Sequence, residues 1–299
     1  MDMNMFKGVI APICSPCDRE EGVDYEALSR NMDKLMATDI KGLYINGGTG
    51  DGGKLTTAER EKIVETLMPA LKAAGKIGIV HVGSTNLREA KAMALHAAAN
   101  GAAAIASVPP RAGWNEIVKY YEQLASTGVP TIVYYMPGAT GVTGGLADLR
   151  RLLDIPGVIG MKVSDWNIFF IKCLKSEYPD KIIYTGLDEM LVPGLSYGAD
   201  GTIGTWINLL PEFYCKVWEL NCKGEYDKLH ILQDAYTEFL TGCWKYGVLD
   251  CFQEIMRYMN LSDKCFREPG SWIPGTMTRD EFENMKAQID MLTALAEKM

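Results

Sequence analysis

The chain has 299 residues, of which 47% are hydrophobic and 23% are charged, and its formal net charge is −8 at pH 7. This is ordinary globular composition, and the length suits one large α/β domain or two smaller ones. The negative charge argues against nucleic acid or an anionic membrane as a partner. No apolar run is long enough to span a membrane, and the first residues are unlike a signal peptide. We therefore expect a cytoplasmic protein.

The eight cysteines are scattered along the chain, which predicts free thiols in a reducing compartment. Cys14 and Cys17 have the spacing of a redox or metal motif. Because no second pair accompanies them and histidines are few, a metal or redox role is the minor alternative. We expect no metal ion in this protein.

Strand-like and helix-like segments alternate from the start of the chain. The expected strands are residues 8–12, 42–46, 77–82, 103–108, 131–136, 158–163, 181–185 and 201–204. The expected helices are residues 25–38, 57–74, 87–100, 114–126, 146–153, 168–178 and 189–197. Thr56 or Thr57 is expected to cap the second of these helices.

Eight strand–helix units in succession predict a TIM (β/α)8 barrel. An open doubly wound sheet is the alternative, but its Gly-x-Gly-x-x-Gly turn is absent after the first strand. From about Leu209 the pattern is helical only, with amphipathic helices expected at 226–246, 250–259 and 278–298. Residues 1–208 are thus predicted to form the barrel. Residues 209–299 are predicted to form its last helix and a three-helix C-terminal extension.

Lys162 interrupts the apolar strand 158–163 near its carboxyl end, where barrel enzymes place their functional residues. Burying an unpaired ammonium costs several kcal/mol, and burial favours loss of the proton. A neutral amine in an apolar pocket attacks carbonyl carbon and forms a Schiff base. The alternative is a lysine that extends from the strand end to water.

A glycine-rich segment, residues 46–53, follows the second expected strand and contains Thr49. Its glycines allow a close approach of backbone N–H groups to a small carboxylate or phosphate, and Thr49 adds a hydroxyl. A plain flexible loop is the alternative. The lysine of a nucleotide-binding P-loop is missing.

The fifth expected strand ends in Tyr134 and Tyr135, which alternation sends to opposite faces. One of them should point into the barrel mouth toward Lys162, where a phenol can carry a proton. The other expectation for such an aromatic is packing beneath the helices.

Asp188 and Glu189 follow the seventh expected strand, and Thr205 follows the eighth. The two carboxylates either cap the next helix or hold sugar hydroxyls. Thr205 offers another hydroxyl and N–H at the same end of the barrel.

Four motifs resemble one family: Gly47-Gly48-Thr49-Gly50-Asp51, Tyr134-Tyr135-Met136-Pro137, Gly160-Met161-Lys162 and Gly198-Ala199-Asp200-Gly201. In this order and spacing, along essentially the whole chain, they resemble the pyruvate-dependent class I aldolases of the N-acetylneuraminate lyase and dihydrodipicolinate synthase superfamily.

The resemblance implies that Lys162 forms a Schiff base with the 2-oxo carbon of pyruvate and that Tyr134 carries the proton. It implies that Thr49 and the amides of Gly48 and Thr49 hold the pyruvate carboxylate. It also implies a homotetramer that needs no metal or organic cofactor and acts on a small 2-oxo acid or sugar.

The branch within the superfamily follows from the residues expected to face the rest of the substrate. Gly138-Ala139-Thr140 stands where the synthase branch has an arginine for a second carboxylate. Gly186, Asp188 and Glu189 are similar to the residues that bind the sugar chain in sialic acid lyases, as are Ser164 and Thr205. The expected reaction is cleavage of N-acetylneuraminate to N-acetylmannosamine and pyruvate. Alternatives are a 2-keto-3-deoxy sugar acid aldolase, a 4-hydroxy-tetrahydrodipicolinate synthase, or a barrel that binds a 2-oxo acid without turnover.

Two stretches of the chain depart from the family pattern, and each lacks a hydroxyl group that the family uses in or near its proton relay. Gly48 stands where Ser or Thr is usual, and Asp51 where Glu is usual. The segment 109–114 lacks the tyrosine that family members often supply to a neighbouring subunit. We therefore expect a relay carried by Thr49 or by water.

Overall fold

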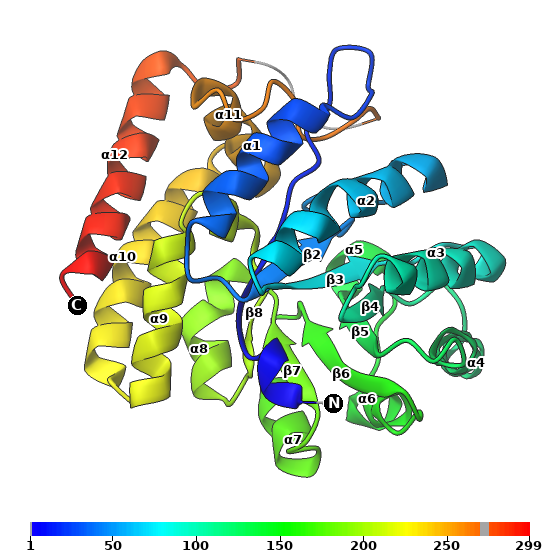
Figure 1. Ribbon diagram of the computed structural model, residues 1–299. Helices are drawn as coiled ribbons and strands as arrows, with labels where there is room; N and C mark the ends of the chain where they lie inside the picture. The colour runs from blue at the N-terminus through cyan, green and yellow to red at the C-terminus, as the bar shows by residue number, and fades with distance from the viewer. Residues whose placement is uncertain (1, 270–274) are drawn as a thin grey trace.

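The computed structural model describes residues 2–269 and 275–299, and eight parallel strands form a closed barrel in sequence order (Figure 1). A (β/α)8 barrel is therefore correct, and the open sheet is excluded. The strands are β1 (Gly8–Pro12), β2 (Gly42–Ile45), β3 (Ile77–His81), β4 (Ala104–Ser107), β5 (Thr131–Tyr135), β6 (Val158–Val163), β7 (Ile182–Thr185) and β8 (Gly201–Thr202).

Helices surround the barrel and extend beyond it at the carboxyl end of the chain. Those of the ring are α1 (Tyr25–Met36), α2 (Thr57–Ala73), α3 (Leu87–Ala99), α4 (Trp114–Ala125), α5 (Pro137–Thr140), α6 (Leu146–Leu153), α7 (Phe169–Glu177), α8 (Leu191–Ser196) and α9 (Pro211–Lys223). The remaining three are α10 (Tyr226–Trp244), α11 (Val248–Tyr258) and α12 (Arg279–Glu297). Thr56 caps α2 through a capping box with Glu59.

Several short elements of the described chain differ from the sequence-based expectation, among them the 3₁₀ turn η3 (Thr205–Asn208). The 3₁₀ turn η1 (Met3–Phe6) and the four-residue α5 were not expected. Another 3₁₀ turn, η2 (Asp188–Met190), precedes α8, where one helix from residue 189 was predicted. Such short turns carry no full period of apolar residues, so periodicity does not reveal them.

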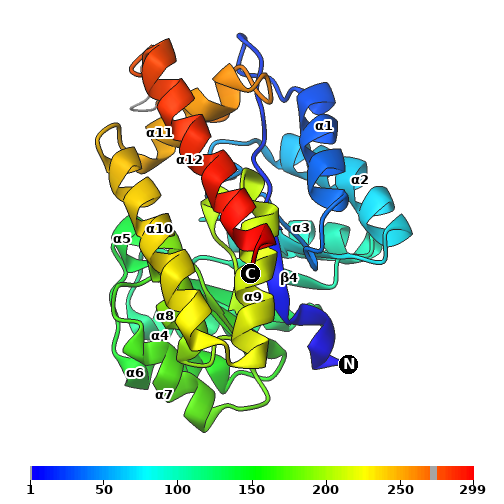
Figure 2. The same cartoon turned by 90° about the vertical axis from the view of Figure 1, so that its left-hand side faces the viewer.

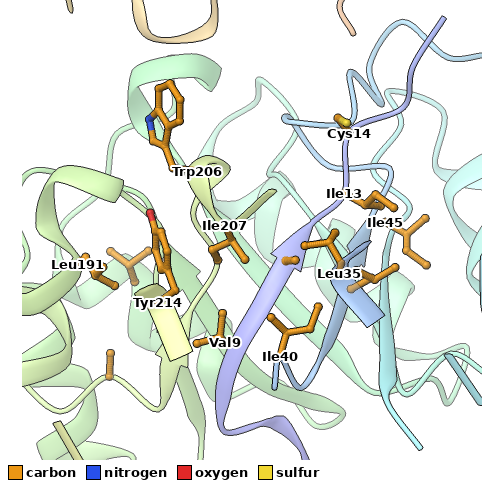
Figure 3. Packing of buried hydrophobic residues seen from close by; sticks show 14 of the residues in the cluster. Val9, Ile13, Cys14, Leu35, Ile40, Ile45, Leu191, Trp206, Ile207 and Tyr214 are labelled. Carbon is orange, nitrogen blue, oxygen red and sulfur yellow. The ribbon is translucent and has the colours of Figure 1, made fainter. Parts of the chain in front are cut away.

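Two apolar clusters divide the core because each strand is buried on both faces. Inside the barrel lie alternate residues such as Ile10, Ile79 and Ile132. The other cluster fills the space between strands and helices and includes their outward neighbours, such as Val9. Figure 3 shows part of this outer cluster around β1, with Tyr214 of α9 among its members.

The C-terminal helices α10 and α12 pack against α9 on one side of the barrel (Figure 2). The predicted boundary after residue 208 falls between η3 (Thr205–Asn208) and α9. The extension also reaches the carboxyl ends of the strands. There Asp51 accepts a hydrogen bond from the Arg267 N–H at 2.7 Å and lies 3.5 Å from the Lys54 ammonium.

All eight cysteines are free thiols, as expected. Across residues 2–269 and 275–299, no group of three or more His, Cys, Asp and Glu side chains is arranged to hold a metal. No helix in the same ranges is both long and apolar enough to cross a membrane.

Candidate active site

Lys162 points into the barrel because of an irregularity in β6. Val158 belongs to the outer cluster, and strict alternation from it would turn Lys162 outward. The pairing of β5 with β6 shifts by one residue after Thr131, so that Gly160 lies opposite Ile132 and Lys162 opposite Tyr134. This bulge re-aims the lysine toward the interior. Only 5% of Lys162 is exposed, which excludes a side chain extended into water.

Two aromatic rings border the Lys162 ammonium. Its Nζ lies 4.0 Å from the ring centroid of Tyr134 and 5.2 Å from that of Tyr44. The two rings meet edge to face at 84°, with centroids 6.0 Å apart. Within the described ranges no carboxylate oxygen lies within 4 Å of the Nζ. Tyr44 was not anticipated, although alternation in its strand would have placed it with the inward residues.

Tyr134 lies inside the barrel, and Tyr135 lies in the outer cluster, as alternation predicts. The Tyr134 hydroxyl donates a hydrogen bond to the Met136 sulfur at 2.9 Å. The Tyr135 hydroxyl donates to the Gly144 carbonyl at 3.1 Å. Of the two phenols, the one beside Lys162 is thus Tyr134.

Gly186 packs directly on the lysine. A Cβ atom at this position would lie 2.7 Å from Lys162 Cε and 2.2 Å from Ser164 Oγ. The Ser164 hydroxyl is buried and has no hydrogen-bond partner among the described residues. The absence of a side chain at Gly186 therefore allows Lys162 and Ser164 to lie side by side.

The glycine-rich loop after β2 presents unused donors. The amides of Gly48 and Thr49 donate to no other group in the described part of the chain. Gly48 is exposed, and a Cβ placed there would meet no atom within 4 Å. The Thr49 hydroxyl lies 3.0 Å from the Thr205 hydroxyl, which joins this loop to the end of β8. Two free N–H groups and a hydroxyl suit a small carboxylate.

Asp188 lies beneath this pair of threonines and is 8% exposed. Its carboxylate accepts from the Thr205 N–H at 2.9 Å and from the Tyr214 hydroxyl, which lies 2.5 Å from the Tyr236 hydroxyl. Burial raises the pKa of Asp188 to about 6, although both hydrogen bonds oppose the shift. Glu189 is half-buried and has no ion pair in the described ranges.

His81 forms part of the wall next to Tyr134, with ring centroids 6.4 Å apart. Burial, and then the charges of Arg60 and Lys162, lower the pKa of His81 to about 3, so its ring is neutral. Its Nε2 accepts a hydrogen bond from the Val108 N–H at 3.1 Å. His81 thereby fixes the start of the loop after β4, which is a structural role.

The fold and these contacts define a class: a (β/α)8 barrel with a buried lysine at the carboxyl end of a strand, a phenol beside it and free backbone donors nearby. Comparison with known proteins gives the same class. The model of the dihydrodipicolinate synthetase family matches residues 5–289.

Curated relatives and solved structures match nearly the whole chain. N-acetylneuraminate lyase 2 of Escherichia coli O6:H1 is 30% identical, over 98% of this chain and 94% of that protein. N-acetylneuraminate lyase of Salmonella typhimurium is also 30% identical, over 86% and 88%. The crystal structure of N-acetylneuraminate lyase from Fusobacterium nucleatum superposes with a TM-score of 0.84 at 25% identity, covering 96% and 99%. Sialic acid aldolase of Ruminococcus gnavus gives 0.88 at 24% identity, covering 98% and 99%, which adds support for the fold.

The chain belongs to the dihydrodipicolinate synthetase family, within the superfamily of class I aldolases that includes the N-acetylneuraminate lyases. It is a lyase with a small-molecule substrate.

The raised pKa of Asp188 predicts a pH-dependent stability. A carboxyl group whose pKa rises from 3.8 to about 6 on folding stabilises the protein below about pH 4 and loses that contribution as the pH rises through 6. From about pH 4 to about pH 7, the unfolding free energy of the wild type should fall by roughly 3 kcal/mol relative to Asp188→Asn. Urea unfolding at several pH values measures this difference. Asp180→Asn, at an exposed aspartate, is the control. A pH-independent difference for Asp188→Asn would contradict the prediction.

Proposed function

We propose that this chain cleaves N-acetylneuraminate to N-acetylmannosamine and pyruvate through a Schiff base on Lys162. The observation that carries the chemistry is the Lys162 Nζ, buried at the barrel mouth 4.0 Å from the Tyr134 ring. The choice of substrate is supported by the relatives at 30% identity that bear the name N-acetylneuraminate lyase.

In the first step the neutral Lys162 amine attacks the 2-oxo carbon of the substrate. One proton from the amine and one from the Tyr134 hydroxyl convert the carbonyl oxygen to water, so that a protonated imine remains on the lysine nitrogen and Tyr134 is left as a phenolate. The free amides of Gly48 and Thr49 and the Thr49 hydroxyl would hold the adjacent carboxylate.

In the second step the bond between C3 and C4 breaks. Its electron pair forms the C2–C3 double bond of an enamine. The π electron pair of the C=N bond moves to the Lys162 nitrogen and neutralises its charge. The Tyr134 oxygen takes the proton of the C4 hydroxyl and returns a proton to C3. Water then hydrolyses the protonated imine, which releases pyruvate and the neutral lysine amine and returns one proton to the Tyr134 phenolate. This chemistry requires neither a metal nor an organic cofactor.

The sugar chain would lie along Ser164, Gly186, Asp188, Glu189 and Thr205. Among the described residues, the Ser164 hydroxyl has no hydrogen-bond partner and the Glu189 carboxylate has no ion pair, so both can bind substrate hydroxyls. Asp188 already accepts two hydrogen bonds from within the protein. It would therefore hold Thr205 in position in addition to binding a hydroxyl of the sugar chain.

The proton relay proposed for this chain differs from the relay that the family resemblance implies. Gly48 supplies no hydroxyl, and residues 109–114 supply no tyrosine. Thr49 or a water molecule would take that place. The same departures favour, as the second candidate, a sister aldolase acting on another 2-oxo acid such as a deoxy sugar acid.

We also propose that the protein assembles as a homotetramer. Trp166 and Phe169, on the rim after β6, are 59% and 58% exposed and provide apolar surface for a subunit contact. Light scattering during size exclusion gives the subunit number, and a monomer would overturn this assignment.

Trapping with borohydride tests the Schiff base. Incubation with pyruvate and borohydride should add one reduced adduct per chain, located on Lys162 by peptide mapping. Lys162→Met keeps an apolar side chain of similar length and should give no adduct. Lys175, which is ion-paired with Asp200 at 2.8 Å, serves as the internal control lysine. An unmodified wild-type protein would eliminate every aldolase hypothesis for this site.

Gly186→Ala tests the close packing on the lysine. The new methyl group would displace Lys162 Cε and Ser164 Oγ, which are flexible ends, so the fold should persist. We expect the trapping rate to fall by about ten-fold or more, because displacement by about 1 Å disrupts attack geometry. Gly53→Ala, where a Cβ meets no atom within 4 Å, should react like the wild type. Equal rates for both variants would show that the packing is irrelevant.

Glu189→Gln tests the tail-binding assignment. Loss of a charged acceptor for a sugar hydroxyl should lower kcat/KM for N-acetylneuraminate by about ten-fold or more. The rate of trapping with pyruvate, which has no tail, should not change. The assignment fails if kcat/KM is unaltered. In the same assay, higher kcat/KM for a deoxy sugar acid would establish the sister-aldolase function instead.

A further inference from the structure

Tyr44 is fully buried in the barrel interior and lies against three parts of the candidate site. Its ring faces the Lys162 Nζ at 5.2 Å and meets the Tyr134 ring edge to face. A Cβ at Gly47 would come within 2.5 Å of the Tyr44 ring, so the backbone of the glycine-rich loop rests on it. One aromatic ring thus touches the loop and both residues assigned to the chemistry.

The surroundings of the Lys162 nitrogen explain why an aromatic ring face can hold it in position. An ammonium is attracted to the negative face of an aromatic ring, and the attraction is strongest where water is excluded. Because no carboxylate lies within 4 Å of the Nζ in the described ranges, the faces of Tyr44 and Tyr134 are its nearest attractive neighbours, and the Asp188 carboxylate attracts it from farther away. Gly186 bounds the same side chain at Cε. The nitrogen is therefore confined from three directions.

We propose that Tyr44 is a positioning residue that acts through its ring face and holds the Lys162 nitrogen, and the cationic imine formed on it, in place opposite Tyr134. This inference rests on the proposed Schiff base. The imine formed by dehydration keeps the positive charge on the same nitrogen, so the face that attracts the ammonium also attracts the imine. The positive charge of the imine disappears when the C3–C4 electron pair reaches the nitrogen.

The hydroxyl of Tyr44 has no part in this role. It is buried and has no hydrogen-bond partner among the described residues. A proton relay requires a partner within hydrogen-bond reach, and the Tyr134 hydroxyl instead donates to Met136. Removal of an unsatisfied buried hydroxyl is expected to leave stability unchanged or to raise it.

Two substitutions separate the ring face from the hydroxyl. Tyr44→Phe keeps the face, and its trapping rate with pyruvate should stay within about two-fold of the wild type, with an equal or higher unfolding temperature. Tyr44→Leu keeps an apolar side chain but removes the face, and its rate should fall by about ten-fold. The proposal fails if Tyr44→Phe is as slow as Tyr44→Leu, or if Tyr44→Leu is as fast as the wild type.

A graded series covers the case in which Tyr44→Leu disturbs folding. Phenylalanine with successively more ring fluorines at position 44 keeps the shape while weakening the negative face. The trapping rate should fall stepwise with fluorination. The same residues at Phe213, which is buried outside the barrel interior, should have no effect. If the trapping rate did not change with fluorination at position 44, Tyr44 would contribute packing and no electrostatic attraction.

The resting protein offers a readout that does not depend on pyruvate. The ring of Tyr44 should shift the NMR signals of the Lys162 Cε protons, so the shift should persist in Tyr44→Phe and shrink in Tyr44→Leu. Unchanged signals in Tyr44→Leu would overturn the positioning role. An absent adduct with these NMR shifts intact would overturn the proposed function alone.

Discussion

The site depends on one constraint: the Lys162 nitrogen lies inside an apolar barrel, and no carboxylate of residues 2–269 or 275–299 lies within 4 Å of it. Desolvating such a charge is expensive. The same region has already shifted two other groups, since burial is the first cause of the raised pKa of Asp188 and of the lowered pKa of His81. In such a dry environment each remaining charge or ring face acts more strongly than it would in water. The Schiff-base role proposed for Lys162 rests on this buried position beside the Tyr134 ring.

The direction of the lysine depends on a single extra residue in β6. A slip of one residue turns every side chain of a strand to the other face. The shift after Thr131 brings Lys162 into register with Tyr134 on one neighbouring strand and with Tyr184 on the other. The bulge therefore determines whether the lysine lies among the interior aromatics or among the helices.

Sequence patterns were sufficient for the barrel and for the members of the site that follow strands directly. Alternating periodicity predicts eight units, and a barrel brings the carboxyl ends of its strands together, so Lys162 and Tyr134 could be placed near each other. The bulge in β6 has no sequence signal of its own. Tyr44 is separated from Lys162 by more than a hundred residues, and its approach depends on the barrel interior. The hydrogen bond from Tyr214 to Asp188 likewise joins a helix to a strand end. These features arise from tertiary packing, which local patterns do not encode.

The loop that would bind the substrate carboxylate is braced from outside the barrel. Asp51 has a left-handed φ of 51°, and its N–H donates to the Gly48 carbonyl at 3.0 Å, which closes the turn. Its side chain accepts from the Arg267 N–H, which belongs to the extension. The Asp51 carboxylate thus ties the loop and the extension together. Because the turn that presents the Gly48 and Thr49 amides is fixed at Asp51, the C-terminal extension contributes to the geometry of the mouth.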